Sequence, residues 1–553
     1  MGARAFRAPC GPAGRCHRCD GTESWDAVSR APSGRCVTGV GRALGIGLVG
    51  LNGFVVECEA DIGQTLPAFV LLGLPDSALN EAKERVRSAA QNSGLPLSRR
   101  KITVNLIPAS LPKRGTAFDL AITVAALAAA GDIRPPADTV FIAELGLDGR
   151  LRPVQGILPA VMAAVRAGYP DVVVAEANAP EARLVPGARV TGYQSLGSLA
   201  LDLGADPVNI VLPEHGARSA ERTELDGEGE PRRGSPDLRD VAGQHDARAA
   251  LEVAAAGGHH VFMIGPPGAG KTMLAERLPS VLPDLCDEAA MEVTAIHSLS
   301  SHPSATRELV RRPPFESPHH TASKSAIIGG GSGIPLPGAA SRAHRGVLFL
   351  DEAPEFDARV LDSLRQPLED GQVSLHRAAG AASYPARFQL VIAANPCPCG
   401  QATGKGLLCT CTPQVRRRYT AKLSGPLLDR VDIQLRVGRV STVDLSSNEL
   451  SESSAAVAAR VALARERQGD RLSRFGLTTN AETPGRLLRG PLRLPPAATR
   501  TLDAAMERQS LTARGYDRVL RLAWSIADLS QLDRPGADEI GQALLLRAGE
   551  AMQ

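Results

Sequence analysis

A glycine-rich loop is the first feature of this 553-residue chain that could do chemistry. An apolar strand-like run, 260–264, leads into it, and residues 273–278 continue as a helix. Glycines let backbone N–H groups approach a phosphate at the start of a helix, and a following Lys-Thr pair can reach the β/γ-phosphates and Mg²⁺. The loop residues are Gly265, Pro266, Pro267, Gly268, Ala269, Gly270, Lys271 and Thr272. This order predicts an ATP site in which Lys271 reaches the phosphates and Thr272 binds Mg²⁺.

Two later strands end in polar side chains of the kinds that a nucleotide-hydrolysing site needs. The strand 346–350 ends in Asp351 and Glu352, and the strand 388–394 ends in Asn395. One carboxylate would hold Mg²⁺, the other would orient the attacking water, and the amide would sense the γ-phosphate. We therefore predict a metal-binding Asp351, a catalytic Glu352 and a sensing Asn395. A surface acidic pair at a strand end is the weaker alternative, given the loop described above.

Two arginines could complete such a site. Arg430 lies between Asp429 and Asp432, and Arg514 lies in the helical C-terminal part. Positive charge at the γ-phosphate stabilises the transition state of phosphoryl transfer. Arg430 could reach the γ-phosphate of a neighbouring subunit, and Arg514 could reach back over the nucleotide. An ordinary salt bridge is the alternative for each, and spacing alone does not decide between them.

Four cysteines form a candidate metal site directly after Asn395. They make two C-x-C pairs within 15 residues, separated by a glycine-containing loop. Four thiolates suit a closed, tetrahedral, structural Zn²⁺ site. Free thiols or a redox switch are the alternatives. The residues are Cys397, Cys399, Cys409 and Cys411.

A β-hairpin is expected between the acidic pair and Asn395, with arms 372–377 and 384–389 and a tip at 378–383. Basic side chains on such a hairpin could contact nucleic-acid phosphates. Those on this one are His376, Arg377 and Arg387.

Two further polar clusters leave their interpretation open. The arginines 416–418, with Lys422, form either a solvated face or a DNA contact. His319 and His320 belong either to a DNA-contacting loop or to a polar turn.

The elements that must position these groups divide into five parts. Residues 1–42 form an irregular, cysteine-containing leader, expected to be disordered or to precede the true translation start. Residues 43–212 alternate strands and helices, 213–237 form a charged linker, 238–440 form a second α/β domain, and 441–553 are helical by period. The expected strands of the first domain are 54–59, 69–72, 102–107, 140–145 and 172–175. The expected helices are 77–92, 119–130 and 158–167 in that domain, and 455–468, 496–509 and 516–529 in the C-terminal part.

Composition sets limits on the class of protein. Apolar residues make up 43% and aromatic residues only 3%, so the cores should consist of Leu, Val, Ile and Ala. The net charge of +3, from 62 basic and 59 acidic residues, gives no global signature of nucleic-acid binding. The longest apolar stretch, 121–131, is too short to cross a bilayer, and no secretory signal is present, so we expect a cytoplasmic protein without a membrane partner. Ten cysteines are too few for a disulfide scaffold.

The combined motifs resemble the YifB/ComM family of Mg-chelatase-like AAA+ ATPases, from residue 43 to about 550. The runs that carry the resemblance in the core are Pro318-His-His-Thr321, the Gly329–Gly331 triplet and the segments 346–356, 395–400 and 424–432. Those in the first domain are 73–76, 84–87, 103–105, 118–120 and 146–154, and those in the tail are 480–481 and 518–529.

The resemblance implies a multidomain α/β fold with a Lon-protease-like N-terminal domain, a P-loop AAA+ core with a pre-sensor β-hairpin, and a helical lid. It also implies that Arg430 is a trans-acting arginine finger, Asn395 a first sensor and Arg514 a second sensor. The family forms a hexameric ring that acts on single-stranded and branched DNA and drives branch migration, best known in natural transformation, with recombination proteins as possible partners. One departure is the Trp524-Ser525 pair, where the family usually has Arg-Thr. It puts in doubt a nucleotide or lid contact from position 524.

The Lon-like domain lacks the residues for peptide hydrolysis. Such a protease needs a serine nucleophile and a lysine base, but Ala117 stands in the serine position and 155–160 contains no lysine. The fold can be shared without the activity.

These observations favour an ATP-dependent hexameric DNA motor that remodels recombination intermediates. One alternative is a chelatase-type ATPase subunit that remodels a metal-inserting partner, and another is a regulator that binds without catalysis. The N-terminal domain and the cysteine cluster favour the DNA motor over the chelatase subunit. The filled catalytic positions argue against the regulator.

Overall fold

The computed structural model describes residues 39–63, 66–72, 77–97, 101–108, 116–213, 236–300, 308–331, 335–377, 380–402, 408–423, 425–440 and 451–548. From Val40 onward these residues belong to one compact unit. Most of the expected leader and linker lies outside the described residues, although β1 begins at Gly41, so the last two leader residues belong to the first strand. Among the described helices, none combines the length and apolar character that crossing a bilayer requires.

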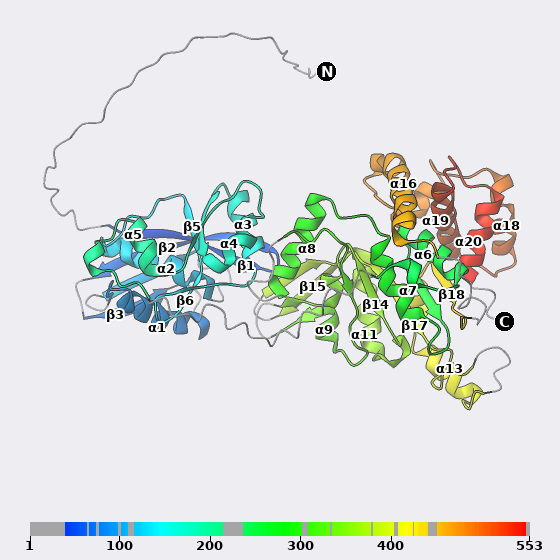
Figure 1. Cartoon of the computed structure of the whole chain (residues 1–553), viewed down its shortest axis with the longest axis horizontal. Coiled ribbons are helices and arrows are strands. Elements are labelled where there is room, and N and C mark those ends of the chain that lie inside the picture. The colour runs from blue at the N-terminus through cyan, green and yellow to red at the C-terminus, as the bar shows by residue number, and fades with distance from the viewer. Residues whose placement is uncertain are drawn as a thin grey trace, which may run out of the picture. The chain divides into compact units, whose positions relative to one another are not determined.

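A seven-stranded mixed sheet organises the N-terminal α/β domain (Figure 1, blue to cyan). Its order is β3-β4-β2-β1-β5-β8-β9. The pairs β4–β2 and β2–β1 are antiparallel, whereas the pairs β5–β8 and β8–β9 are parallel. The strands are β1 (Gly41–Val49), β2 (Asn52–Gly63), β3 (Ala68–Leu72), β4 (Lys101–Ile107), β5 (Thr139–Ile142), β8 (Asp171–Ala175) and β9 (Arg189–Tyr193). The expected strand 140–145 is wrong in its extent, because the chain leaves the sheet after Ile142 and Glu144–Leu145 pairs with Leu151–Arg152 instead.

Two apolar cores lie between the sheet and the helices of this domain. One core joins β2 and β4 to α1 (Ser77–Asn92) and α2 (Asp119–Ala130). The other joins β5 and β8 to α3 (Ile157–Arg166). Helix α2 is apolar on nearly every side and is buried from Asp119 to Leu127, which explains its Ala-rich composition. The bounds of α1 and α2 confirm the sequence prediction.

A five-stranded parallel sheet forms the centre of the second α/β domain, in the order β11-β14-β17-β10-β18. The strands are β11 (Phe315–Glu316), β14 (Val347–Leu350), β17 (Gln389–Ala394), β10 (Val261–Ile264) and β18 (Ile433–Arg436). Strands β14 and β17 are buried along their whole length, as expected of strands covered on both faces. The strand that leads into the glycine-rich loop, β10, lies between β17 and β18.

The C-terminal part is helical and shares an apolar core with α6 (His245–Gly257) and β10. Its main helices are α16 (Ser454–Leu472), α18 (Pro496–Glu507), α19 (Ala513–Leu529) and α20 (Ala537–Ala548). The three helices predicted there are confirmed, each within three or four residues at its ends. Because this core is continuous with the parallel sheet, movement of the helices and of the nucleotide-binding strand cannot be independent.

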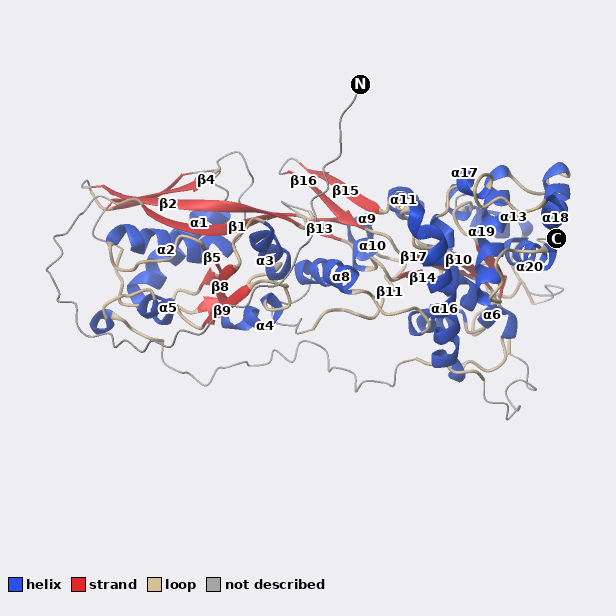
Figure 2. Ribbon diagram, turned by 90° about the horizontal axis from the view of Figure 1, so that it is seen from above, coloured by secondary structure: helices blue, strands red, loops and turns tan. Residues whose placement is uncertain are grey.

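The expected hairpin is present, but its second arm was placed wrongly. It consists of β15 (Gln372–Arg377) and β16 (Gly380–Pro385) (Figure 2). Phe388 precedes β17, and Gln389 is the first residue of that strand. Residues 380–383, which were predicted to belong to the tip, are paired: Gly380 lies opposite Arg377, and Ala382 lies opposite Leu375. A hairpin with so short a connection is a stiff ribbon.

One side of this hairpin packs on the N-terminal domain. Ala382 and Tyr384 are buried in a small apolar cluster with Leu48, Leu51 and Leu299. Leu299 belongs to α8 (Asp287–Ser300), which also packs against α3, and the Gly156 N–H donates to the Ser298 carbonyl at 3.0 Å. The N-terminal domain therefore braces both α8 and the hairpin.

Candidate nucleotide site

The glycine-rich loop has the strand–loop–helix setting that phosphate binding requires. It follows β10 at Gly265 and ends where α7 (Lys271–Arg277) begins. Gly268 and Gly270 have φ angles of 74° and 89°, a region in which a side chain would be strained. The Lys271 ammonium donates to the Gly265 and Pro266 carbonyls at 2.7 and 3.0 Å, across the mouth of the loop.

The structure brings together the four polar groups that the sequence predicted. Lys271 Nζ donates to Asn395 Oδ1 at 3.1 Å, and the Thr272 hydroxyl donates to Asp351 Oδ2 at 2.7 Å. These contacts form because β10, β14 and β17 are neighbouring parallel strands whose carboxyl ends meet at one edge. Burial lowers the pKa of Lys271, against the opposing effect of the Asp351 and Glu352 carboxylates.

The same edge of the sheet suits a divalent cation. The Thr272 hydroxyl and the Asp351 carboxylate are hard oxygen ligands, of the kind that Mg²⁺ takes in nucleotide sites. Their oxygens lie 2.7 Å apart, so one ion could take both as neighbouring ligands. A magnesium ion bound there would neutralise negative charge on the phosphates.

Glu352 is held differently from Asp351. Its backbone has a φ of 48°, in the left-handed region, and its N–H donates to Asp351 Oδ1 at 2.8 Å. Strained backbone of this kind is typical of functional sites. The side chain is 51% exposed, and its Oε2 lies 3.7 Å from His320 Nδ1. Sequence reasoning missed this pair, because 31 residues lie between the two positions and the His-His run gave no indication of its neighbour.

The two predicted arginines lie together rather than at the glycine-rich loop. Arg430 and Arg514 line one cavity of about 710 Å³, to which Arg365 and Lys324 also contribute. Arg430 forms an ion pair with Glu369, and Arg430 Nη1 donates to the Pro426 carbonyl at 2.6 Å. Burial lowers the pKa of Arg430, and repulsion from Arg365 and Arg514 lowers it further. The loop residues 265–272 are not among those lining this cavity.

A buried polar network fixes the helical part next to these arginines. Arg518, on α19, donates to the Arg430 carbonyl at 2.9 Å and to Asp432. His259 Nε2 lies 2.7 Å from the Ser525 hydroxyl, which also accepts from Asn480 at 3.0 Å. Both imidazole and hydroxyl are fully buried, so these contacts cannot be replaced by water.

Trp524 and Ser525, which differ from the usual Arg-Thr pair of the family, lie in or beside this network. The guanidinium of Arg471 lies 4.3 Å from the centre of the Trp524 ring, a cation–π contact. Arg471 also donates to Asp528. Position 524 thus packs within the helical part, and position 525 joins that part to the core.

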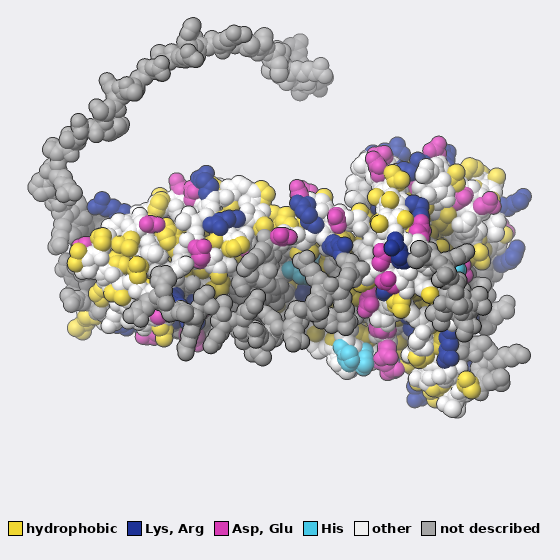
Figure 3. All heavy atoms as spheres, viewed as in Figure 1, with side chains coloured by type: hydrophobic (Ala, Val, Ile, Leu, Met, Phe, Trp, Pro, Cys, Tyr) yellow, Lys and Arg dark blue, Asp and Glu magenta, His cyan; other side chains and the backbone are white. Residues whose placement is uncertain are grey.

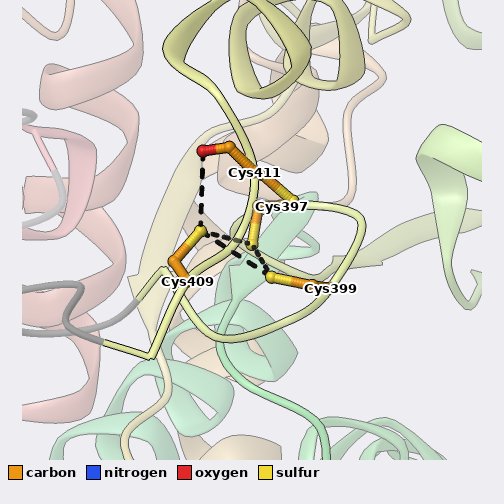
Figure 4. Close-up of side chains that lie close together, drawn as sticks. All are labelled: Cys397, Cys399, Cys409 and Cys411. Atoms are coloured by element: carbon orange, nitrogen blue, oxygen red, sulfur yellow. Dashed lines mark hydrogen bonds between the residues drawn. The ribbon is translucent and has the colours of Figure 1, made fainter.

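The four predicted cysteines converge on one point (Figure 4). The Cys397 sulfur lies 3.3 Å from that of Cys399 and 3.7 Å from that of Cys409, and the Cys399 and Cys409 sulfurs are 3.7 Å apart. A tetrahedral zinc ion with Zn–S bonds of about 2.3 Å would separate its sulfurs by about 3.8 Å. The Sγ of Cys411 completes the group, since all four sulfurs lie within 4.8 Å of one another. This donor set fits zinc.

The surroundings favour the thiolate form at one of the four cysteines, Cys399. A hydrogen bond with the backbone of Gln401, followed by one with Cys397, lowers the pKa of the Cys399 thiol to about 6. Thiolates, not thiols, bind metal ions. At Cys409 and Cys411 a backbone hydrogen bond lowers the pKa, but hydrogen bonds with Cys397 and Cys399 outweigh it and raise the pKa of both thiols.

The candidate DNA-contacting residues do not form one continuous patch. Arg377 lies at the tip end of β15, whereas Arg387 follows β16 at the base, and both are exposed. Helix α13 (Pro413–Ala421) carries exposed Arg417 and Arg418 beside the cysteine cluster. On the face shown in Figure 3, the visible described side chains of opposite charge are interspersed. Any nucleic-acid contact must therefore depend on a few local positions.

Comparisons with known proteins show the family of this chain. Three family models match the chain: magnesium chelatase, subunit ChlI, over residues 237–445; subunit ChlI of Mg-chelatase over 58–178; and magnesium chelatase, subunit ChlI C-terminal, over 451–547. The chain is 48% identical over 519 residues to an uncharacterized protein of Mycobacterium tuberculosis, covering 92% of this chain and 98% of that protein. It is 39% identical over 503 residues to YifB of Escherichia coli, with 90% and 95% covered. It is 38% identical over 503 residues to the competence protein ComM of Haemophilus influenzae, with 90% and 96% covered.

The chain belongs to the YifB/ComM family of Mg-chelatase-like AAA+ ATPases. Membership confirms the resemblance seen in the motifs and makes the protein an ATPase that uses ATP and Mg²⁺. One stretch of 146 residues is also 32% identical to Lon protease 2 of Bacillus subtilis, covering 26% of each chain. That partial likeness, with the mixed and parallel sheets, fits the multidomain α/β fold expected for this family.

Proposed function

We propose that this YifB/ComM-family ATPase is a homo-hexameric DNA motor that promotes branch migration of recombination intermediates. The observation that carries the proposal is the short connection between a basic hairpin and the nucleotide site. Only residues 386–388 separate β16 from β17, and β17 ends directly before Asn395, which contacts Lys271. The name of the competence protein ComM, a relative along nearly the whole chain, also supports a role in DNA uptake.

Each residue of the nucleotide site has a proposed role. The loop 265–272 binds the triphosphate, with Lys271 on the β/γ-phosphates, and Thr272 and Asp351 hold Mg²⁺. Glu352 orients the attacking water, and Asn395 detects whether the γ-phosphate is present. Asn395 bonds to Lys271, the same lysine that is proposed to bind the γ-phosphate. Asn395 would therefore detect the γ-phosphate next to this lysine.

The connection from Asn395 to the hairpin is stiff enough to transmit such a change. The Arg387 N–H donates to His344 Nδ1 at 3.0 Å, and the Ala386 N–H donates to the Gly371 carbonyl at 2.8 Å. Strand β17 is paired on both sides, with β10 and β14. Movement at Asn395 would therefore shift the hairpin instead of being lost in a loose loop.

We assign both predicted arginines to the nucleotide of a neighbouring subunit. This assignment departs from the expectation that Arg514 reaches back over the nucleotide of its own subunit. Its support is the shared cavity, where Arg514 stands beside Arg430 and the loop 265–272 is not among the lining residues. Closely spaced cations repel one another and are stabilised by a bound polyanion. The edge of a neighbour's triphosphate site would supply that negative charge.

A mixing experiment tests the assignment of the arginines. Lys271→Ala removes nucleotide binding but keeps Arg514. Arg514→Ala removes this arginine but keeps the nucleotide-binding loop. If Arg514 acts on a neighbour, mixing the two inactive variants creates interfaces with a complete site, and ATP turnover returns. If Arg514 acts within its own subunit, every site in the mixture stays defective and no activity returns. Arg430→Ala is tested in the same way.

ATP turnover with and without DNA tests the proposed function. We expect a four-way junction and single-stranded DNA to raise the turnover rate, because contact with the hairpin would favour the hydrolysing state. Lys271→Ala is the control for contaminating ATPases. If no DNA structure changes the rate or binds the protein, the DNA motor is wrong, and a subunit that remodels a protein partner becomes the better hypothesis.

A further inference from the structure

The carboxylate of Glu352 needs to be held in place if it is to orient water. Half of the side chain is exposed, and the peptide N–H of Glu352 is occupied by the neighbouring Asp351. An exposed carboxylate rotates among several staggered positions, and few of them point at one water molecule. The contact described for its Oε2 is with His320 Nδ1, at 3.7 Å.

The ring of His320 is itself supported. The ring of His319 lies against it, with centroids 4.1 Å apart and planes inclined by 35°. His319 Nδ1 lies 2.8 Å from the Thr321 hydroxyl, which anchors that second ring. Two residues further on, the Ser323 hydroxyl accepts from the Ala326 N–H and caps α9 (Lys324–Ile328). The turn that carries His320 is therefore fixed to a helix.

We propose that His320 is a positioning residue that confines Glu352 to the orientation needed for ATP hydrolysis. The imidazole closes one side of the space through which the carboxylate would otherwise swing. Its polar edge faces Oε2, so that orientation is favoured by electrostatics as well as by shape. His320 acts through Glu352. This inference requires only the ATPase activity of the family. It does not depend on DNA binding or on assembly into a ring.

The surroundings of His320 leave two competing roles to be tested. His320 also lines an open cavity of about 590 Å³ with Thr321, Glu355, Arg359 and Lys422, so it could contact a partner there instead. It could also serve only to fold the turn. A loss of turnover alone would not separate these roles from positioning.

Steady-state kinetics without DNA provide the first test. We expect His320→Ala to lower kcat about tenfold, since displacing a reacting group by about an ångström can cost up to a hundredfold, while the KM for ATP stays unchanged. His320→Asn keeps an N–H donor near the position of Nδ1 and should recover most of the rate. His320→Gln places its amide further out and should recover less. His245→Ala, an exposed histidine at the start of α6, is the matched control and should leave both constants unchanged.

A double-mutant cycle decides whether His320 acts through Glu352. In the Glu352→Gln background, with the residual rate measured in a single turnover, His320→Ala should cause no further loss. Nucleotide binding in the double variant verifies that the site still folds. The proposal is overturned if the same tenfold loss appears in that background, if KM alone changes, or if kcat is unchanged or rises in His320→Ala. A failure of DNA to stimulate turnover would reject the DNA motor and leave this result untouched.

Discussion

Removing the charge of Arg377 should weaken DNA binding more than removing the charge of Arg387. The two arginines were predicted together as hairpin phosphate contacts, but the structure separates them. Arg377 is the last residue of β15 and pairs with Gly380 at the tip. Arg387 lies beyond Pro385, where the ribbon joins the core, and its backbone N–H is bonded to His344.

The expected magnitude follows from the length of the ribbon and from counterion release. Six residues of β15, at about 3.3 Å each, place the tip roughly 17 Å from the base. Two groups so far apart cannot share one phosphate. Each phosphate contact adds about 0.9 to the slope of log K against log salt on duplex DNA, and about 0.7 on a single strand. Arg377→Ala should therefore reduce the magnitude of the slope by the value of one contact, about 0.9 on duplex DNA or about 0.7 on a single strand. It should also abolish DNA stimulation of turnover and leave the basal rate unchanged.

Arg387→Ala is the matched comparison, because it removes the same charge from the same segment. We expect it to change the slope by less than half as much. The assay is the affinity for a labelled oligonucleotide at several salt concentrations, with ATP turnover measured in parallel. An equal or larger effect of Arg387, or no effect of either, would refute the reasoning. In the latter case Arg417 and Arg418 on α13 become the candidates.

Three further outcomes are expected. Glu352→Gln should still bind ATP but lose roughly a hundredfold or more in turnover, and near-normal turnover in a phosphate-release assay would refute its catalytic role. Elemental analysis should find about one zinc ion per chain, and the double change of Cys397 and Cys409 to Ser should remove it and lower the melting temperature; zinc-free wild type purified without chelators would reject the site. Ser525→Ala should lower the free energy of unfolding by about 1–3 kcal/mol, because it removes the hydrogen-bond partner of the buried His259 Nε2. Urea denaturation measures that loss, and a change below about 0.5 kcal/mol would contradict it.

The arrangement of the residues predicted for the nucleotide site was predictable because it depends on local pattern and on one general rule of topology. The loop 265–272 needs only its own glycines and the flanking strand and helix. The meeting of Lys271 with Asn395 follows from the fact that parallel strands present their carboxyl ends at one edge. The cysteine cluster was predictable for a similar reason, since four ligands close together in sequence leave few other arrangements.

Other features depend on contacts that no local pattern encodes. The run 378–383 was predicted as the hairpin tip, yet residues 380–383 pair across the hairpin, where Ala382 and Tyr384 are buried against the N-terminal domain. The place of Arg514 is set by the packing of α19 through Arg518 and Ser525, which a helical period cannot reveal. Strand β1 was missed because its glycines gave it the composition of the preceding leader.

Movement of a DNA junction coupled to ATP hydrolysis is the central claim, and a branch-migration assay measures it directly. A labelled four-way junction with homologous arms is incubated with the protein, and the conversion to migrated products is followed over time. With ATP and Mg²⁺, the wild-type protein should convert the junction faster than spontaneous migration, whereas the Lys271→Ala and Glu352→Gln variants should not. Conversion that is unaffected by ATP, or active ATP hydrolysis on the bound junction with no conversion, would contradict the account.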